Sequence, residues 1–304
     1  MKKIKIGIPR ALLYHRYGVL WKTFFKTIGC NTVISPLTNR EIISLGSNNS
    51  VDETCLAYKI YLGHVIYLAD KCDYLLVSRV CDYGPKDKVC TRLNATYDNI
   101  KELIPENKII YYNLEKTSFN YELFGFIKMG LKITKNLPKI IYAYYLGKKN
   151  QQKYNENHEN NQKNMLQTSN KKILILSHFY NIEDKFVSSY IINYLKNNNI
   201  TPIFSNRLNR KIATEFSEYF SETMYWKYSK EMIGSLYYYQ YQISGIIYLS
   251  CYPCGIDALV NNLSIIKNNH FPTLNLIIDE NITELSLETK LESFLDIIKG
   301  GSND

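Results

Sequence analysis

The feature that most constrains the fold of this chain is an alternation of short apolar segments with helical segments along nearly the whole sequence. Strands of a parallel sheet covered by helices on both faces are apolar almost throughout, whereas half-exposed strands alternate in polarity. The apolar segments follow the first pattern, so the sequence predicts an α/β fold. The expected strands are Lys3–Ile8, Thr32–Ser35, Asp73–Ser78, Lys108–Tyr112, Lys172–Ser177, Pro202–Phe204, Ser244–Ser250 and Thr273–Asp279.

A polar stretch interrupts this alternation once. Of the 21 residues 150–170, seven are asparagine and four are glutamine. Such a segment buries too little apolar surface to offset its ordering entropy, so we expect a loop or an interdomain linker. The sequence therefore predicts two tandem Rossmann-like, doubly wound parallel-sheet domains with a cleft between them. Their expected bounds are 1–147, which includes a helical extension, and 171–304, with a linker at 148–170.

Local signals predict where several helices begin and end. The sequences Thr38–Glu41 and Ser50–Glu53 have the capping-box pattern, so we expect helices to start at both, the second running through Cys55 to about Ala69. Residues 79–89 are expected to form a loop. The helical pattern also predicts one long helix around Glu218–Tyr239.

Charge and hydropathy exclude several classes of protein. The chain has 37 basic and 28 acidic residues, but its lysines are scattered singly and no arginine-rich stripe occurs. We therefore expect a basic solvated surface and no nucleic-acid partner. Charged residues interrupt every long apolar run, and the N-terminus lacks an apolar signal-peptide segment, so no membrane association is expected. The sequence predicts a cytoplasmic protein.

The positions of the seven cysteines divide them into two groups. An odd number in a chain expected to be cytoplasmic argues against a disulfide framework. Cys30 and Cys72 precede strands and are expected to fill the core. Ligands of open parallel sheets bind at the carboxyl ends of the strands. Five cysteines are expected at that edge: Cys55, Cys81, Cys90, Cys251 and Cys254.

Cys55, Cys90 and Cys254 are expected where helices begin. Unpaired backbone N–H groups and the positive end of the helix dipole stabilise a thiolate there and favour metal ligation. Two alternatives stay open: a redox dithiol of Cys251 and Cys254, and a structural zinc site made of all four of these cysteines. An iron–sulfur cluster with three thiolate ligands and one open iron is the hypothesis that we favour.

Four other residues are candidates for the same edge. Arg10 and Arg79 follow strands and could bind a phosphate, a carboxylate or the negative charge of a cluster. Glu280 and His178 also follow strands and are candidates for proton transfer. The chain has no phosphate-binding glycine loop, so we do not expect it to hydrolyse ATP itself.

Several motifs occur in a specific order: Ile6–Tyr14, Ser35–Asn39, Val51–Cys55, Lys59–Val65, Val89–Cys90, Cys254–Asp257 and Thr273–Glu280. In this order they resemble the 2-hydroxyacyl-CoA dehydratase / benzoyl-CoA reductase family, and more closely its short, stand-alone members related to the dehydratase activases. The resemblance covers nearly the whole chain outside the polar stretch.

The resemblance implies a 4Fe–4S cluster between two Rossmann-like domains, held by cysteines that match Cys55, Cys90 and Cys254 here. Cys251 and Cys81 would be additional ligands if the cluster were of the double-cubane type. It also implies an ATP-dependent activase as electron donor, a possible acyl-CoA substrate, dehydratase-like lyase or reductase chemistry under anaerobic conditions, and work as a homodimer or heterodimer.

Three positions depart from the family pattern: Ala57, the turn Tyr252-Pro253 before Cys254, and Asn281, where the family commonly has a histidine. A non-catalytic electron-transfer or accessory subunit is therefore the alternative function.

Overall fold

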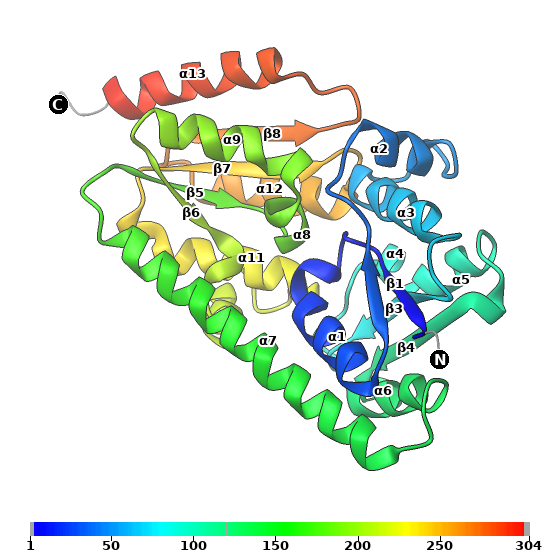
Figure 1. The fold of residues 1–304 in the computed structure, drawn as a ribbon. Helices are drawn as coiled ribbons and strands as arrows, with labels where there is room; N and C mark the ends of the chain where they lie inside the picture. Colours follow the sequence, from blue (N-terminus) through cyan, green and yellow to red (C-terminus); the bar gives the residue numbers. More distant parts are fainter. Residues whose placement is uncertain (1–2, 120, 301–304) are drawn as a thin grey trace. The chain divides into compact units, whose positions relative to one another are not determined.

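The computed structural model describes residues 3–119 and 121–300 (Figure 1). The chain divides into two compact units. The first unit consists of Met1–Glu156 with Tyr225–Lys227, and the second of Asn157–Met224 with Tyr228–Asp304. No helix in the described ranges is long and apolar enough to cross a membrane.

The first unit is built on a four-stranded parallel sheet in the order β2-β1-β3-β4. Its strands are β1 (Lys5–Ile8), β2 (Asn31–Ile34), β3 (Tyr74–Asp82) and β4 (Ile109–Glu115). Its helices are α1 (Tyr14–Ile28), α2 (Arg40–Ser47), α3 (Leu56–Leu68), α4 (Thr91–Asn94), α5 (Thr96–Lys101), α6 (Glu122–Leu131) and the part of α7 (Leu137–Leu166) that ends at Glu156.

The second unit has a sheet of the same design, in the order β6-β5-β7-β8. Its strands are β5 (Lys172–Leu176), β6 (Thr201–Phe204), β7 (Gly245–Cys251) and β8 (Thr273–Ile278). The helices that follow α7 are α8 (Phe179–Glu183), α9 (Lys185–Asn197), α10 (Arg210–Phe216), α11 (Lys227–Tyr239), α12 (Gly255–Lys267) and α13 (Glu284–Gly300). Single 3-10 turns lie at η1 (Glu106–Lys108), η2 (Lys116–Ser118), η3 (Ser205–Arg207), η4 (Ser217–Tyr219) and η5 (Gln240–Gln242).

In each unit the chain forms an inner strand first, then the edge strand on one side of it, and then the two strands on its other side. Because crossovers between parallel strands are right-handed, this reversal places successive helices on opposite faces of the sheet. Strands β5, β6 and β7 are buried almost completely, as a sheet covered on both faces requires. The predicted α/β fold with two doubly wound parallel sheets is confirmed, and a cleft between the units stays a prediction.

The two units repeat one local contact at the carboxyl edge of each sheet. The backbone N–H of Arg10, after β1, donates to the hydroxyl of Ser35, which follows β2 (2.9 Å). In the second unit the N–H of Ser177 donates to the hydroxyl of Ser205 over 3.1 Å. Both serines are buried, so each fixes the chain where it leaves its first strand.

The polar stretch is mostly helical, so the expected loop was wrong. The alternative of an interdomain linker stays a prediction, and the boundary between the two units, at Glu156 and Asn157, lies within the stretch. Residues 148–166 form the second part of α7, a single long helix (Figure 1). Two buried glutamines explain its order. The side chain of Gln151 accepts a hydrogen bond from the N–H of Leu20, at 3.2 Å. Gln162 pairs with both backbone groups of Phe204, so it satisfies the edge of strand β6. Asparagine and glutamine content alone did not reveal these contacts.

The start of α3 and the end of β3 also differ from expectation. The capping box at Ser50–Glu53 is not used, because α3 begins at Leu56 with Cys55 as its N-cap. Strand β3 continues through Asp82, although residues 79–89 were expected to form a loop. Arg79 remains paired with β4 because its charged group is satisfied by hydrogen bonds, which we describe below.

The long helix expected around Glu218–Tyr239 is interrupted. The N–H of Lys88 donates to the carbonyl of Tyr225, and the N–H of Lys227 donates to the carbonyl of Lys88, each over 2.8 Å. Pairing of this kind requires extended backbone, so the helix cannot continue through these residues. α11 therefore begins only at Lys227, and Glu218 lies in the separate 3-10 turn η4.

Candidate functional site

Three of the predicted ligands occupy the same local position. Cys55, Cys90 and Cys254 are the N-cap residues of α3, α4 and α12, and each has an extended backbone conformation. In the part of the chain that the structure describes, no side-chain hydrogen bond caps these helices. All three cysteines are partly exposed. At α3 and α12, each 13 residues long, the first-turn N–H groups and the helix dipole favour a negatively charged sulfur.

Cys90 and Cys254 are related by the repeat of the fold. Strands β3 and β7 occupy the same place in the two sheets. Each of these cysteines begins the helix that follows its strand. The order in which strands are added to the sheet reverses between β1 and β3 in the first unit and between β5 and β7 in the second. Open α/β sheets bind ligands at such points.

In the first unit, Tyr58 links the helices that begin at Cys55 and Cys90. It lies in the first turn of α3, and its hydroxyl accepts a hydrogen bond from the side chain of Asn99 (2.9 Å). The guanidinium carbon of Arg92, in α4, lies 5.9 Å from its ring centroid. Burial raises the pKa of Tyr58, and the charge of Cys90 acts in the same direction. The first turns of α3 and α4 are therefore close to each other.

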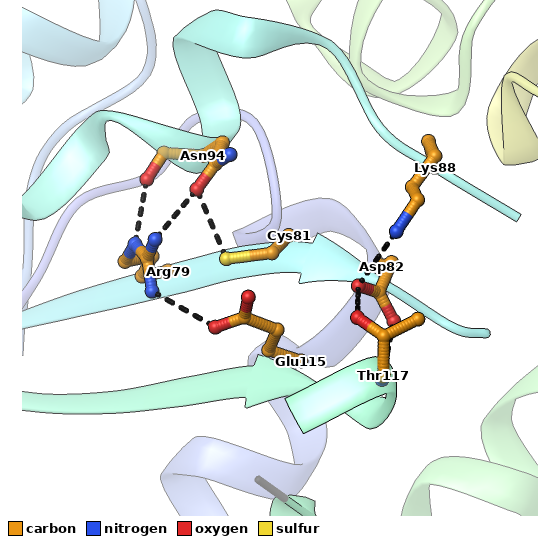
Figure 2. Close-up of polar contacts among 7 residues, drawn as sticks. All are labelled: Arg79, Cys81, Asp82, Lys88, Asn94, Glu115 and Thr117. Atoms are coloured by element: carbon orange, nitrogen blue, oxygen red, sulfur yellow. Dashed lines mark hydrogen bonds and ion pairs between the residues drawn. The ribbon is translucent and has the colours of Figure 1, made fainter. Parts of the chain in front are cut away.

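Arg79 ties α4 to the sheet (Figure 2). Its Nε donates to the backbone carbonyl of Asn94 and its Nη2 to the side-chain oxygen of Asn94, each over 2.8 Å. Its Nη1 lies 3.5 Å from a carboxylate oxygen of Glu115 on β4. Because Asn94 is the last residue of α4, these contacts position the short helix that begins at Cys90. A cofactor-binding role for Arg79 stays a prediction.

Two further cysteines, predicted as additional ligands, are buried hydrogen-bond donors. The Sγ of Cys81 donates to the side-chain oxygen of Asn94 (3.0 Å; Figure 2), and that of Cys251 to the side-chain oxygen of Asn181 (3.3 Å). Burial raises the pKa of Cys81 to about 11, although the charge of Arg79 acts in the opposite direction. Without a metal, Cys81 is therefore a thiol at neutral pH. The roles of Cys81 and Cys251 as additional ligands stay predictions.

Asp82 fixes the segment that leads from β3 to Cys90. One carboxylate oxygen accepts from the N–H groups of Gly84 and Thr117, and the other accepts from the Thr117 hydroxyl and from Lys88 Nζ (Figure 2). Burial acts to raise the pKa of Asp82, but these hydrogen bonds outweigh it and hold the pKa below its usual value. The side chain is 2% exposed, so the carboxylate is a buried anchor.

Arg10 contributes positive charge at the edge of β1 and β2. Its Nε donates to the carbonyl of Ser35 (3.0 Å). Nearby, Nε2 of the buried His64 lies 3.1 Å from the hydroxyl of Thr38. Burial lowers the pKa of His64 to about 3, and the charges of His15 and Arg10 contribute. His64 is therefore neutral, and Arg10 supplies permanent positive charge here. Its predicted cofactor-binding role stays a prediction.

In the second unit, His178 pairs with a buried carboxylate. Its Nε2 lies 2.8 Å from Oδ1 of Asp257, and the two side chains are 6% and 3% exposed. The Nδ1 atom is buried and has no hydrogen-bond partner among the described residues. The ring of Tyr180 stacks on the imidazole, with centroids 5.1 Å apart. A proton on Nε2, next to the carboxylate, leaves a lone pair on Nδ1.

Asp257 was quoted in a motif but received no role from the sequence. It lies in the first turn of α12, three residues after Cys254, a position that often carries an acidic residue. Asn94 and Asn181, which orient two thiols, were missed entirely because nothing in their sequence context marks them. Glu280 lies in the turn after β8, and its predicted role in proton transfer stays a prediction.

Within residues 3–119 and 121–300, no group of three or more histidine, cysteine, aspartate or glutamate side chains is arranged to hold a metal ion. Cys55 and Cys90 belong to the first unit and Cys254 to the second. The gathering of all three sulfur atoms around one cofactor stays a prediction.

Comparison with known proteins gives one family. The model of a "CoA enzyme activase uncharacterised domain (DUF2229)" matches residues 5–208. This agrees with the activase-related part of the resemblance described above, and the likeness to dehydratase subunits stays a prediction. No curated protein matches the chain.

Two solved structures align along nearly the whole chain. One is a crystal structure of ZnuA, with 7% identity and a TM-score of 0.28 over 98% of this chain and 99% of that chain. The other is the SBP FpvC from Pseudomonas aeruginosa in complex with Mn²⁺, with 12% identity and a TM-score of 0.24 over 98% of both chains. Scores this low carry no inference about fold or function.

Proposed function

Because this chain belongs to the family of CoA enzyme activase uncharacterised domains, we propose that it is an iron–sulfur protein. In this proposal Cys55, Cys90 and Cys254 hold a 4Fe–4S cluster. The protein would carry out low-potential one-electron chemistry on an acyl-CoA or a small molecule, with an ATP-dependent activase as the electron donor.

The observation that carries the proposal is the shared N-cap position of these three cysteines. Each is partly exposed at the start of a helix, whereas Cys81 and Cys251 are buried donors. Thiolates are the usual ligands of iron–sulfur clusters, and backbone N–H groups near the sulfurs stabilise their charge. When bound, such a cluster supplies single electrons at low potential.

The chain's own residues have distinct roles in this proposal. Arg79 and Asn94 position the helix that presents Cys90. Arg10 provides positive charge that favours an anionic cofactor or substrate. His178, oriented by Asp257, would accept or donate a proton at Nδ1.

The test is anaerobic iron and sulfide analysis of the wild type beside three variants, Cys55→Ala, Cys90→Ala and Cys254→Ala. The wild type should be brown, with thiolate-to-iron absorption near roughly 400 nm, and each variant should lose most of its iron. Cys30→Ala is the matched control, because Cys30 is buried in the core. The iron content of this variant should equal that of the wild type. Colourless wild-type protein that takes up no iron on reconstitution, or that holds zinc instead, would contradict the proposal.

A non-catalytic electron-transfer or accessory subunit is the second candidate. Asn281, at the position where a histidine is common in the resembling family, favours it, because an asparagine cannot donate a proton as a histidinium can. Acyl-CoA turnover by the isolated, cluster-loaded chain with a reduced activase would exclude this candidate. Reversible reduction of the cluster without turnover would support it.

A further inference from the structure

Two exposed helix faces that the proposed cluster site does not use carry opposite charge. On the part of α7 that belongs to the first unit, one side of the helix presents the residues of what we call the lysine–tyrosine face: Lys139, Tyr142, Tyr145, Lys149 and Lys153. Steps of three and four residues keep these side chains on one side of an α-helix. All five are exposed, with Tyr142 at 62% and Tyr145 at 58%.

The second face lies on α13 in the other unit. Its acidic residues recur at every fourth position and are exposed: Glu284, Glu288, Glu292 and Asp296. We call this set the acidic face. Leu285 is 74% exposed beside Glu284 and adds an apolar contact. Tyr190 and Tyr194 of α9 lie beside this face. Burial raises the pKa of both phenols, and the charges of the acidic face raise it further.

We propose that the lysine–tyrosine face of one copy of this chain docks on the acidic face of a second copy. The lengths of the two faces match: at 1.5 Å of rise per residue, Lys139 to Lys153 spans about 21 Å and Glu284 to Asp296 about 18 Å. Opposite charges attract across such a contact, while two copies of the same face repel each other. The contact therefore joins two different faces, and a two-fold dimer would contain it twice.

The expected strength of the contact follows from its chemistry. Exposed ion pairs are individually weak, so three or four pairs give a weak association, to which Tyr142 and Tyr145 add apolar area. Charges at a solvated interface are screened by salt, since the Debye length falls from about 10 Å at 0.1 M to about 3 Å at 1 M. Association should therefore depend on protein concentration and decrease with salt. It does not depend on the proposed cluster.

Sedimentation velocity of the purified full chain tests the proposal at 50 mM and 500 mM NaCl. The wild type should sediment above the monomer mass at high concentration in low salt, and association should weaken about tenfold or more in high salt. The triple variants Lys139→Glu/Lys149→Glu/Lys153→Glu and Glu284→Lys/Glu288→Lys/Glu292→Lys should each be monomeric. Their equimolar mixture should associate, because both faces are acidic in the first variant and both are basic in the second. Opposite charges therefore meet only when one copy of each variant comes together.

A matched control separates this contact from general charge effects. Lys26→Glu/Lys116→Glu/Lys211→Glu changes the net charge equally at exposed lysines outside the two faces and should associate like the wild type. Circular dichroism of each variant verifies that it folds. A wild type that is monomeric at every concentration would overturn the proposal. So would an unchanged mass in either triple variant, or a control that dissociates as they do.

Discussion

At the scale of single residues, burial decides the charge of His64. Its pKa of about 3 lies below the ordinary value of 6.5, because burial and the neighbouring charges of His15 and Arg10 disfavour the imidazolium. The unfolded chain therefore binds a proton between these values that the folded chain does not. We expect the free energy of unfolding to fall by up to about 1.4 kcal/mol per pH unit as the pH drops from about 6.5 towards 4.5.

Chemical denaturation at several pH values measures this slope in the wild type and in His64→Gln. The variant should show a shallower slope over the same range. His270→Gln is the control, since His270 is exposed and its loss should leave the slope unchanged. Equal slopes in wild type and His64→Gln would show that His64 is not held neutral.

The pair of His178 and Asp257 makes a separate prediction at this scale. The negative charge of Asp257, with Oδ1 2.8 Å from Nε2, favours the tautomer that carries its proton on Nε2 and leaves a lone pair on Nδ1. In Asp257→Asn the side-chain amide can donate as well as accept, so we expect a population with the proton on Nδ1. Nitrogen chemical shifts of His178 in long-range ¹⁵N spectra report the tautomer, and Asp279→Asn is the control. An unchanged tautomer in Asp257→Asn would show that the carboxylate does not orient the ring.

At the scale of elements, α2 and α3 pack backbone to backbone through two glycines. A Cβ on Gly63 would lie 1.9 Å from the carbonyl oxygen of Ile42, and one on Gly46 would lie 1.8 Å from that of Lys59. Both obstacles are backbone atoms and cannot rotate away. Gly63→Ala should therefore destabilise the first unit by roughly 1–3 kcal/mol or more. Thermal unfolding measures this against Gly300→Ala, where a Cβ has open space and little change is expected. Equal melting temperatures would contradict this packing.

The elements also show what the sequence can and cannot predict. The strands were predictable because strands buried on both faces, such as β7, are apolar throughout. The second part of α7, residues 148–166, was not predictable as a helix, because its order depends on a hydrogen bond from Gln162 to Phe204, 42 residues away. Likewise Arg79 looked like the end of a strand, and only its contacts with Asn94 explain why β3 continues.

The candidate site also has one part that the sequence predicts and one part that it does not. That Cys90 and Cys254 begin helices followed from the strand and helix pattern, and the structure agrees. The partner of His178 did not, because Asp257 comes from a different helix, 79 positions along the chain. Contacts between segments that are distant in sequence depend on the fold, and a single sequence carries no local signal for them.

At the scale of the whole molecule, the proposed cluster takes ligands from both compact units. Each unit has its own sheet and core, so each can open separately when no cofactor joins them. A ligand that binds only the folded state stabilises every part that must be folded to bind it. Loading the cluster should therefore slow hydrogen exchange in both units, around α3 and α4 in the first and around α12 in the second.

Hydrogen-exchange mass spectrometry of anaerobically loaded protein, before and after removal of iron by a chelator, measures this coupling. Chelation should speed exchange in both units together. In Cys254→Ala, which lacks the ligand from the second unit, addition of iron and sulfide should no longer slow exchange around α12. Cys30→Ala should behave like the wild type. Slower exchange confined to one unit of the loaded wild type would mean that the cofactor is held by that unit alone, because a cluster with ligands from both must stabilise both.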